Sequence, residues 1–255
     1  MSFNNILSEN NIIILEIGNS RLKIDNGLDI DFYDYTYSNK DIDEKKIIEF
    51  LNEKLIKYKP TKIYYSSVNP SIENLLYVNF EIKNINNYLS LSGIDFSDIS
   101  DMGIDRKLGL IAANELYGSS ILTIDCGTAQ TYNVSINKKC LGGYITPGFK
   151  TRLKSLFENT NIPEIEYDEI LFSNEIGKNS KDAIINGIYQ SMLSEIKYFI
   201  ENLNSKYVDL QIVLTGGNSF YFSNLLKEND FSLILHENLV NDGIKVILSK
   251  IYDKQ

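Results

Sequence analysis

The sequence predicts an α/β protein made of two similar halves, each built on a mixed β-sheet. Three observations lead to this prediction. The 255 residues are 43% apolar, which is enough for one large core or for two cores of about 120 residues each. Strand-like apolar runs alternate with stretches of helical period along most of the chain. One strand–turn–strand pattern occurs early in each half, and such a repeat suggests a duplicated sheet domain.

The first half begins with strands and continues with alternating helices and strands. Residues 1–10 are polar and rich in Asn, so we expect a loose extension there. Residues 80–100 are rich in Asn, Ser and Asp and give no clear pattern. Apolar residues spaced in the helical period mark helices, and β-rich runs mark strands. The expected strands are 12–15, 21–24, 30–37 and 62–67, and the expected helices are 41–57, 72–77 and 106–117.

The second half repeats this order with longer helices. A turn at Asn137-Lys138 separates two of its strands. The expected strands are 121–124, 131–136, a third ending at 145, 210–214 and 232–235, and the expected helices are 149–159, 181–203, 221–227 and 241–252. No stretch has the composition of a linker. The repeat alone therefore places the predicted domains at 1–117 and 118–255.

Composition and charge exclude several classes of function and location. A net charge of −9 argues against a nucleic-acid-binding protein, because such proteins usually carry a basic stripe. The longest apolar runs fall short of the ~20 residues that a membrane span needs. The first residues have no basic region followed by an apolar core, so we expect no signal peptide. We expect a cytoplasmic protein that binds neither nucleic acid nor membrane.

Cysteine and histidine are too few for a metal site or a disulfide framework. Cys126 and Cys140 lie in strand-like segments, where we expect reduced, buried thiols. His236 is the single histidine, and a structural role is the simplest prediction for it.

The strongest signal is a repeated acid–glycine turn. IIILEIGNS and SILTIDCGTA each place a carboxylate, Glu16 or Asp125, two positions before a glycine at the end of an apolar strand. A tight turn at Gly18 or Gly127 exposes backbone N–H groups to a phosphate. Carboxylates suit Mg²⁺. Lys23, on the outgoing strand, can supply a positive charge to the phosphates.

Each turn alone has an ordinary explanation, because glycine is common in β-hairpin loops. Two copies, each with an acid two residues before the glycine, favour phosphate binding. A third turn follows the strand at 210–214, where Gly216 and Gly217 allow close approach of a flat or phosphorylated ligand such as adenosine. Alone, that third turn is equally compatible with the start of a helix.

Asp105 and Arg106 suggest a catalytic segment. An aspartate beside an arginine at the start of a helix can provide a base and an anchor for a substrate carboxylate. The alternative is that Asp105 merely caps the helix and that Arg106 is solvated. Because the same chain also contains two acid–glycine turns, we favour a catalytic role for this segment.

In this order, the motifs resemble those of the type III pantothenate kinases over nearly the whole chain. The matching segments are Glu16-Ile17-Gly18-Asn19-Ser20 with Lys23, Gly103-Ile104-Asp105-Arg106, Asp125-Cys126-Gly127-Thr128-Ala129, Leu141–Gly148, Ile176-Gly177-Lys178-Asn179-Ser180 and Thr215-Gly216-Gly217. No single segment is decisive, but the ordered set is specific.

The resemblance implies the fold and the reaction. The fold would be two ribonuclease-H-like domains of the actin-like ATPase kind with mixed sheets and a central interdomain cleft, and we expect Glu16 and Asp125 on opposite walls of that cleft. The reaction would be ATP-dependent phosphorylation of pantothenate to 4′-phosphopantothenate, the first step of coenzyme A biosynthesis. Mg²⁺ and a monovalent cation, K⁺ or NH₄⁺, would assist. The family also implies a homodimer.

The resemblance also implies residue roles. Asp105 would be the catalytic proton acceptor, and Asp125 would bind the monovalent cation. Glu16 would hold Mg²⁺, directly or through water. The residues expected to bind ATP or its phosphates are Glu16, Gly18, Asn19, Ser20, Lys23, Thr128, Gly216 and Gly217. The residues expected to bind pantothenate are Phe96, Gly103, Ile104, Asp105, Arg106 and Ser180.

Three positions depart from the family pattern. Glu16 replaces an Asp, Phe96 stands where many members have a Tyr, and Ser180 replaces a Thr. These departures keep two alternatives open. One is another small-molecule kinase or phosphatase of the same superfamily, and the other is a nucleotide-binding regulator with weakened catalysis.

Overall fold

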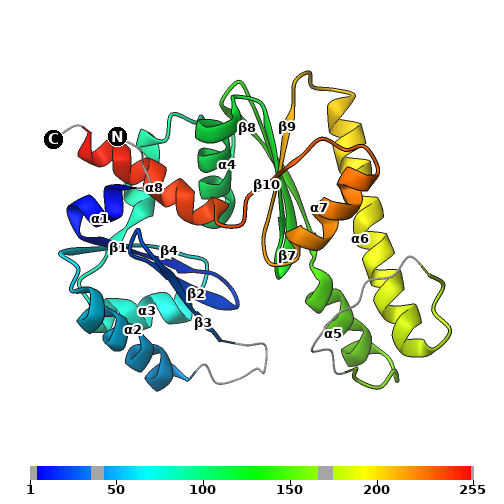
Figure 1. Cartoon of the computed structure of the whole chain (residues 1–255), viewed down its shortest axis with the longest axis horizontal. Coiled ribbons are helices and arrows are strands. Elements are labelled where there is room, and N and C mark those ends of the chain that lie inside the picture. Colours follow the sequence, from blue (N-terminus) through cyan, green and yellow to red (C-terminus); the bar gives the residue numbers. More distant parts are fainter. Residues whose placement is uncertain (1–4, 36–42, 166–174, 254–255) are drawn as a thin grey trace. The chain divides into compact units, whose positions relative to one another are not determined.

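The computed structural model describes residues 5–35, 43–165 and 175–253 (Figure 1). Contacts divide the chain into two compact units. The first comprises Met1–Ser119, Asn137–Cys140 and Asn238–Gln255, and the second comprises Ser120–Ile136 and Leu141–Glu237. The first division falls beside the expected boundary, whereas the last helix belongs to the first unit. Whether each predicted half, 1–117 and 118–255, is a domain by itself stays a prediction.

A five-stranded mixed sheet forms the centre of the first unit. Its strands run in the order β3-β2-β1-β4-β5. The pairs β1–β2 and β2–β3 are antiparallel, whereas β1–β4 and β4–β5 are parallel. The bounds are β1 Ile12–Ile17, β2 Arg21–Asp25, β3 Ile30–Asp34, β4 Lys62–Ser67 and β5 Lys83–Asn84.

Helices cover both faces of this sheet because β1 is apolar on both sides. Leu15 faces a core shared with α2 (Glu44–Tyr58) and α3 (Pro70–Asn79). Ile14 faces a second core. The helices that contribute to this second core are α1 (Ile6–Asn10), the 3₁₀ helix η2 (Ile85–Leu91), α4 (Ile104–Tyr117) and α8 (Leu239–Tyr252).

Two details of the second core differ from, or add to, the prediction. The expected loose extension is wrong for residues 5–10, because Ile6 and Leu7 of α1 are buried in the core. These two adjacent apolar residues were the signal for a buried helix in an otherwise polar segment. On α8, a Cβ at Gly243 would lie 2.2 Å from the Leu108 carbonyl oxygen of α4. Glycine therefore allows these two helices to pack closely.

The second unit is built on another five-stranded mixed sheet. Its order is β10-β9-β6-β7-β8. The pair β6–β7 is antiparallel, and β6–β9 and β9–β10 are parallel. The bounds are β6 Ile121–Cys126, β7 Ala129–Ile136, β8 Lys139–Pro147, β9 Gln211–Thr215, β10 Ile234–Leu235, α5 Phe149–Asn159, α6 Ser180–Asn204 and α7 Ser219–Glu228. Apolar residues of the sheet and of all three helices form one core.

Several local predictions are confirmed. Asn137 and Lys138 have φ angles of 50° and 62°, as a tight hairpin turn between β7 and β8 requires. Cys126 and Cys140 are buried thiols and are not joined in a disulfide. Among the described helices, none has the length and apolar character needed to cross a membrane. The predicted α/β class with mixed sheets in both halves is also confirmed.

Candidate active site

The first acid–glycine turn is the β1–β2 hairpin of the first unit. The Gly18 N–H donates to the Arg21 carbonyl over 2.9 Å, so Asn19 and Ser20 form the tip of the turn. Tyr35 holds this turn from outside the hairpin, because its hydroxyl donates to the carbonyls of Gly18 and Arg21. Its own N–H donates to the Ser20 carbonyl over 3.1 Å. The turn thus has a fixed backbone path.

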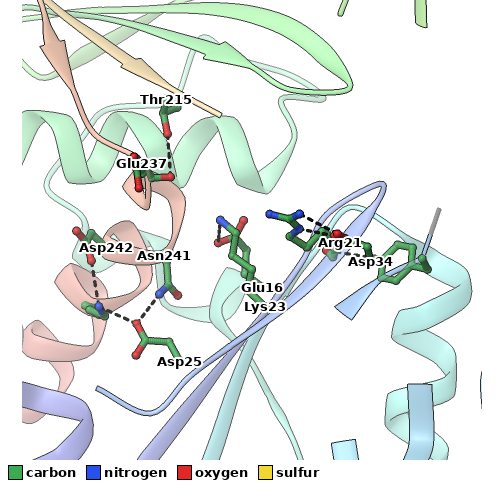
Figure 2. Close-up of polar contacts among 11 residues, drawn as sticks. Glu16, Arg21, Lys23, Asp25, Asp34, Thr215, Glu237, Asn241 and Asp242 are labelled. Atoms are coloured by element: carbon green, nitrogen blue, oxygen red, sulfur yellow. Dashed lines mark hydrogen bonds and ion pairs between the residues drawn. The ribbon is translucent and has the colours of Figure 1, made fainter. Parts of the chain in front are cut away.

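Glu16 and Lys23 lie directly opposite each other in this hairpin. The Lys23 ammonium and the Glu16 carboxylate form an ion pair of 3.3 Å (Figure 2). Their side chains are 21% and 15% exposed, so the pair is only partly screened by water. On the other side of Glu16, Ser66 of β4 is in register with it and is buried. Residues in register share a face, so these three polar side chains form a row across the sheet.

The row lies on the face that α4 covers, since Ile14 of β1 faces the core that includes Ile104 of α4. Asp105, the next residue of α4, accepts a hydrogen bond from the Arg106 N–H over 2.8 Å. The helix N-cap is Gly103, with no side-chain cap. Asp105 is therefore not the N-cap residue, although its carboxylate accepts from an N–H of the first turn.

The carboxyl group of Asp105 is buried, and its pKa is shifted. Burial raises the pKa of its carboxyl group, although the Arg106 N–H and guanidinium act in the opposite direction. Burial also lowers the pKa of Arg106. A Cβ on Gly103 would lie 2.6 Å from the Asp105 carboxylate. The glycine in this segment thus makes room for the acid.

Phe96 lies in the first unit, partly buried against the second core. The Lys107 ammonium lies 5.8 Å from the centre of its ring. The backbone beside it is fixed, because Asp95 N–H donates to the Lys138 carbonyl and the Cys140 N–H donates to the Asp95 carbonyl. The ring is therefore held in place by packing and by a cation–π contact.

The second acid–glycine turn joins β6 to β7 in the second unit. Cys126 pairs with Gln130, which leaves the three residues Gly127, Thr128 and Ala129 as the loop. The Gly127 N–H donates to the Ala129 carbonyl over 3.2 Å. Asp125 is the residue before the last one of β6 and is partly exposed beside this loop. The chain thus repeats the arrangement of the first unit: strand, acid, glycine turn, strand.

The third glycine turn lies against the second one. Thr215 at the end of β9 is in register with Asp125 of β6. Gly216 has a φ of +89°, and a Cβ there would lie 2.2 Å from the Asp125 carboxylate. A Cβ on Gly217, by contrast, would meet nothing within 4 Å. The structure therefore brings Asp125, Thr128 and Gly216 together at one edge of the sheet, where the carboxyl ends of two parallel strands meet.

Ser180 is the first residue of α6 and is exposed. The preceding residue, Asn179, caps the helix by accepting from the Asp182 N–H over 2.9 Å. A Cβ on Gly177 would lie 2.2 Å from the Ala183 backbone nitrogen. The glycine of this segment therefore folds the chain onto the first turn of α6, next to Ser180.

One buried polar cluster was missed by the sequence analysis. Asp25 at the end of β2 is 2% exposed and accepts hydrogen bonds from Asn241 and, over 2.7 Å, from Lys245 (Figure 2). Lys245 also pairs with Asp242 over 3.1 Å. The signal was present as three polar residues on one side of an otherwise apolar helix. The cluster joins the hairpin that carries Lys23 to α8.

The carboxylates of the two acid–glycine turns are the candidate ligands for a bound cation. No group of three or more His, Cys, Asp or Glu side chains among the described residues could hold a metal ion. Each acid–glycine turn nevertheless offers one carboxylate, Glu16 or Asp125. Mg²⁺ is usually held by one or two carboxylates together with substrate phosphates and water, not by a cage of protein ligands. The residues therefore fit Mg²⁺ bound together with a nucleotide.

The predicted site residues thus fall into two groups. The first unit holds Glu16, Gly18, Asn19, Ser20, Lys23, Phe96, Gly103, Ile104, Asp105 and Arg106, and the second holds Asp125, Thr128, Ser180, Gly216 and Gly217. Their roles, and the expectation that Glu16 and Asp125 serve one cleft, stay predictions.

Solved structures resemble this chain in fold. A conserved Baf family protein from Campylobacter jejuni has a TM-score of 0.65 and 21% identity, with 94% of this chain and 99% of that chain covered. The ethanolamine utilization protein EutJ from Carboxydothermus hydrogenoformans has a TM-score of 0.52 and 12% identity, with 96% and 94% covered. At these identities the likeness concerns the fold alone. It confirms the predicted actin-like class.

Sequence comparison identifies relatives. A type III pantothenate kinase from Kosmotoga olearia is 34% identical over 163 residues, which cover 62% of this chain and 59% of the relative. Another, from a Sulfurihydrogenibium species, is 30% identical over 234 residues, which cover 84% of this chain and 91% of the relative. The model of the type III pantothenate kinase family matches residues 12–202. The chain therefore belongs to the type III pantothenate kinase family.

Proposed function

We propose that this protein transfers the γ-phosphate of ATP to the terminal hydroxyl of pantothenate, which yields 4′-phosphopantothenate for coenzyme A biosynthesis. Family membership supports a phosphotransferase with this substrate. The structural observation that carries the proposal is the acid–glycine turn at the end of the first strand of each sheet. A turn of this kind combines backbone donors with a carboxylate, which is the set that phosphoryl transfer requires.

The acid–glycine turns of the first and of the second unit would both bind the nucleotide phosphates. In the first unit, Asn19 and Ser20 would donate from the hairpin tip, and Lys23 would exchange its contact with Glu16 for one with a phosphate oxygen. In the second unit, Thr128 would donate to phosphate. The open space beside Gly217 would accept the adenosine part. Gly18 and Gly216 have no side chains, so the ligand could approach the backbone of these turns closely.

Asp105 would accept the proton of the attacking hydroxyl. Its carboxylate already accepts one hydrogen bond from Arg106, and its raised pKa favours proton transfer. Phe96, Gly103, Ile104, Arg106 and Ser180 would hold the pantothenate. Arg106 suits the carboxylate of that substrate, because a guanidinium binds a carboxylate through two parallel hydrogen bonds.

The cations and the assembly belong to the same proposal. Mg²⁺ beside Glu16 would neutralise charge on the phosphates when it is bound. Asp125 would hold K⁺ or NH₄⁺. The protein would act in the cytoplasm as a homodimer.

A product assay tests the proposal. The purified protein, given pantothenate, ATP, Mg²⁺ and K⁺, should form 4′-phosphopantothenate, detected by mass spectrometry. Parallel reactions with a sugar, acetate or polyphosphate as acceptor test other chemistry of the superfamily. ATP-dependent thermal stabilisation without any product, under conditions where a family enzyme is active, would refute catalysis and support a regulator.

A further inference from the structure

The hairpin turn of the second unit is held from one side by the first turn of α5. The Thr128 carbonyl accepts hydrogen bonds from the Gly148 N–H over 3.0 Å and from the Thr151 hydroxyl over 2.7 Å. A Cβ on Gly148 would lie 2.1 Å from the Gly127 carbonyl oxygen. Both hydrogen bonds end on the backbone of the turn. They therefore fix the path of the segment whose N–H groups and Thr128 side chain would meet phosphate.

Arg152, the next residue of α5, holds this helix start in turn. Its guanidinium donates to the Pro147 carbonyl over 2.7 Å, at the end of β8. Its Nη2 lies 2.7 and 2.8 Å from the two oxygens of the Glu195 carboxylate of α6, and its Nη1 donates to the Ser191 hydroxyl over 3.1 Å. With a side chain only 16% exposed, Arg152 is a fixed bridge between β8, α5 and α6.

These polar contacts lie on a different side of α5 from its packing face. Phe149 and Leu153 are each 1% exposed and bury the helix in the core of the second unit. That apolar contact is enough to dock the helix, because burial of large apolar side chains is the main source of such docking. The hydrogen bonds of Thr151 and Arg152 determine how the first turn of α5 is placed against Gly127 and Thr128.

We propose that Thr151 and Arg152 are positioning residues for the nucleotide, which act through the backbone of residues 127–129. The proposal rests on the proposed function, in which this turn binds phosphate. Neither residue touches a substrate in it. They hold the turn in its binding geometry in the absence of nucleotide, which lowers the free-energy cost of ordering the turn on binding.

The sharpest test is Thr151→Val, which keeps the shape of the side chain and removes its hydroxyl. Loss of one hydrogen bond of about 1 kcal/mol should raise the KM for ATP about fivefold. The dissociation constant for ADP, measured by calorimetry, should rise by a similar factor. The KM for pantothenate should not change. Thr151→Ser keeps the hydroxyl and should restore the wild-type KM for ATP.

A matched control is available at the other end of the same helix. The Thr160 hydroxyl donates to the Leu156 carbonyl over 2.6 Å, so Thr160→Val also removes a contact between a threonine hydroxyl and a carbonyl. This variant should leave both KM values unchanged. Equal effects of Thr151→Val and Thr160→Val, equal rises in the two KM values, or failure of Thr151→Ser to restore ATP affinity would each overturn the proposal.

Arg152→Lys provides a second, independent variant. It keeps the charge but has a single nitrogen, whereas Arg152 uses three different nitrogens to reach Pro147, Ser191 and Glu195, so it should raise the KM for ATP in the same direction. An unchanged KM for ATP in a folded Arg152→Lys protein would count against the proposal. Failure of the proposed function looks different: the wild-type protein would form no product, whereas ADP binding by the Thr151 variants could still be compared.

Discussion

Gly216 and Asp125 lie so close that a Cβ on the glycine would stand 2.2 Å from the carboxylate oxygen of the aspartate. Gly216 also has a φ of +89°, which a side chain rarely tolerates. We expect Gly216→Ala to displace Asp125 and to lower the free energy of unfolding by about 1 kcal/mol or more, because that is the cost of the left-handed backbone alone. Thermal unfolding measures this loss.

Gly217→Ala is the matched control. A Cβ at Gly217 meets nothing within 4 Å, and its φ is not in the left-handed region. The thermal stability of this variant should therefore be close to that of the wild type. If both alanine variants lose stability equally, the contact between Gly216 and Asp125 does not govern this turn.

Asp105→Asn should remove most of the activity and leave the fold intact. The amide keeps the shape of the side chain but cannot accept a proton, and loss of a general base usually costs about 10²-fold or more in rate. Steady-state kinetics with pantothenate and ATP, beside a circular dichroism spectrum, gives the answer. Full activity in this variant would reject Asp105 as the base.

The raised pKa of Asp105 predicts the pH dependence of activity and of stability. Activity should fall as the pH drops through this pKa, at a pH above the value of about 4 of an ordinary aspartate. Stability follows the opposite sign: a carboxyl group whose pKa is raised by folding stabilises the protein when protonated, and this contribution is lost as pH rises through the folded-state pKa. Asp105→Asn should therefore melt at a higher temperature than the wild type at neutral pH. Equal melting temperatures would contradict this assignment.

Lys23→Met should impair nucleotide binding more than it impairs folding. The substitution removes the cation expected to meet phosphate and leaves the partly buried Glu16 carboxylate without its ion pair. We expect the KM for ATP to rise by about tenfold or more, and the KM for pantothenate to change little. Glu16→Asp, which restores the residue typical of the family, should keep activity. A loss of activity in Glu16→Asp as large as in Lys23→Met would show that the longer acid is required here.

Asp25→Asn should destabilise the first unit strongly. Asp25 and Lys245 are 2% and 8% exposed, and removing one partner of a buried pair costs about 3–5 kcal/mol. Lys245 retains Asp242, so we expect the lower end of this range. Asp34→Asn is the comparison, because Asp34 pairs with Arg21 at an exposed site and such pairs contribute about 0–1 kcal/mol. Urea unfolding of both variants distinguishes the two cases.

The sequence predicted local structure well where one periodicity dominated. The strand at 62–67 and the helix at 149–159 have the bounds that were expected. The approach of Gly216 to Asp125 could not be predicted in the same way, because it depends on the parallel register of β9 and β6. Periodicity describes one element at a time, whereas register depends on pairs of strands distant in sequence.

The same limit applies to side-chain partners. Lys23 was expected near phosphate, and the antiparallel register that places it opposite Glu16 follows from the short turn. The partners of Asp25 lie on a helix more than two hundred residues away, as the Asn241 contact shows. The polar residues on one side of α8 could mark a buried polar contact, but local patterns do not identify a partner so distant in sequence. The predicted third strand, 30–37, ends at Asp34, and part of the expected segment lies outside the described residues.

The membership of α8 in the first unit has a consequence for synthesis of the chain. Val240, Ile244 and Ile247 of α8 help to complete a core whose buried members outside this helix all precede residue 112. A ribosome must therefore translate the entire second unit before α8 can cover the apolar surface of the first unit. During that interval the β1 face that carries Ile12 and Ile14 lacks its α8 cover, and chaperones that bind exposed apolar segments have their longest opportunity there.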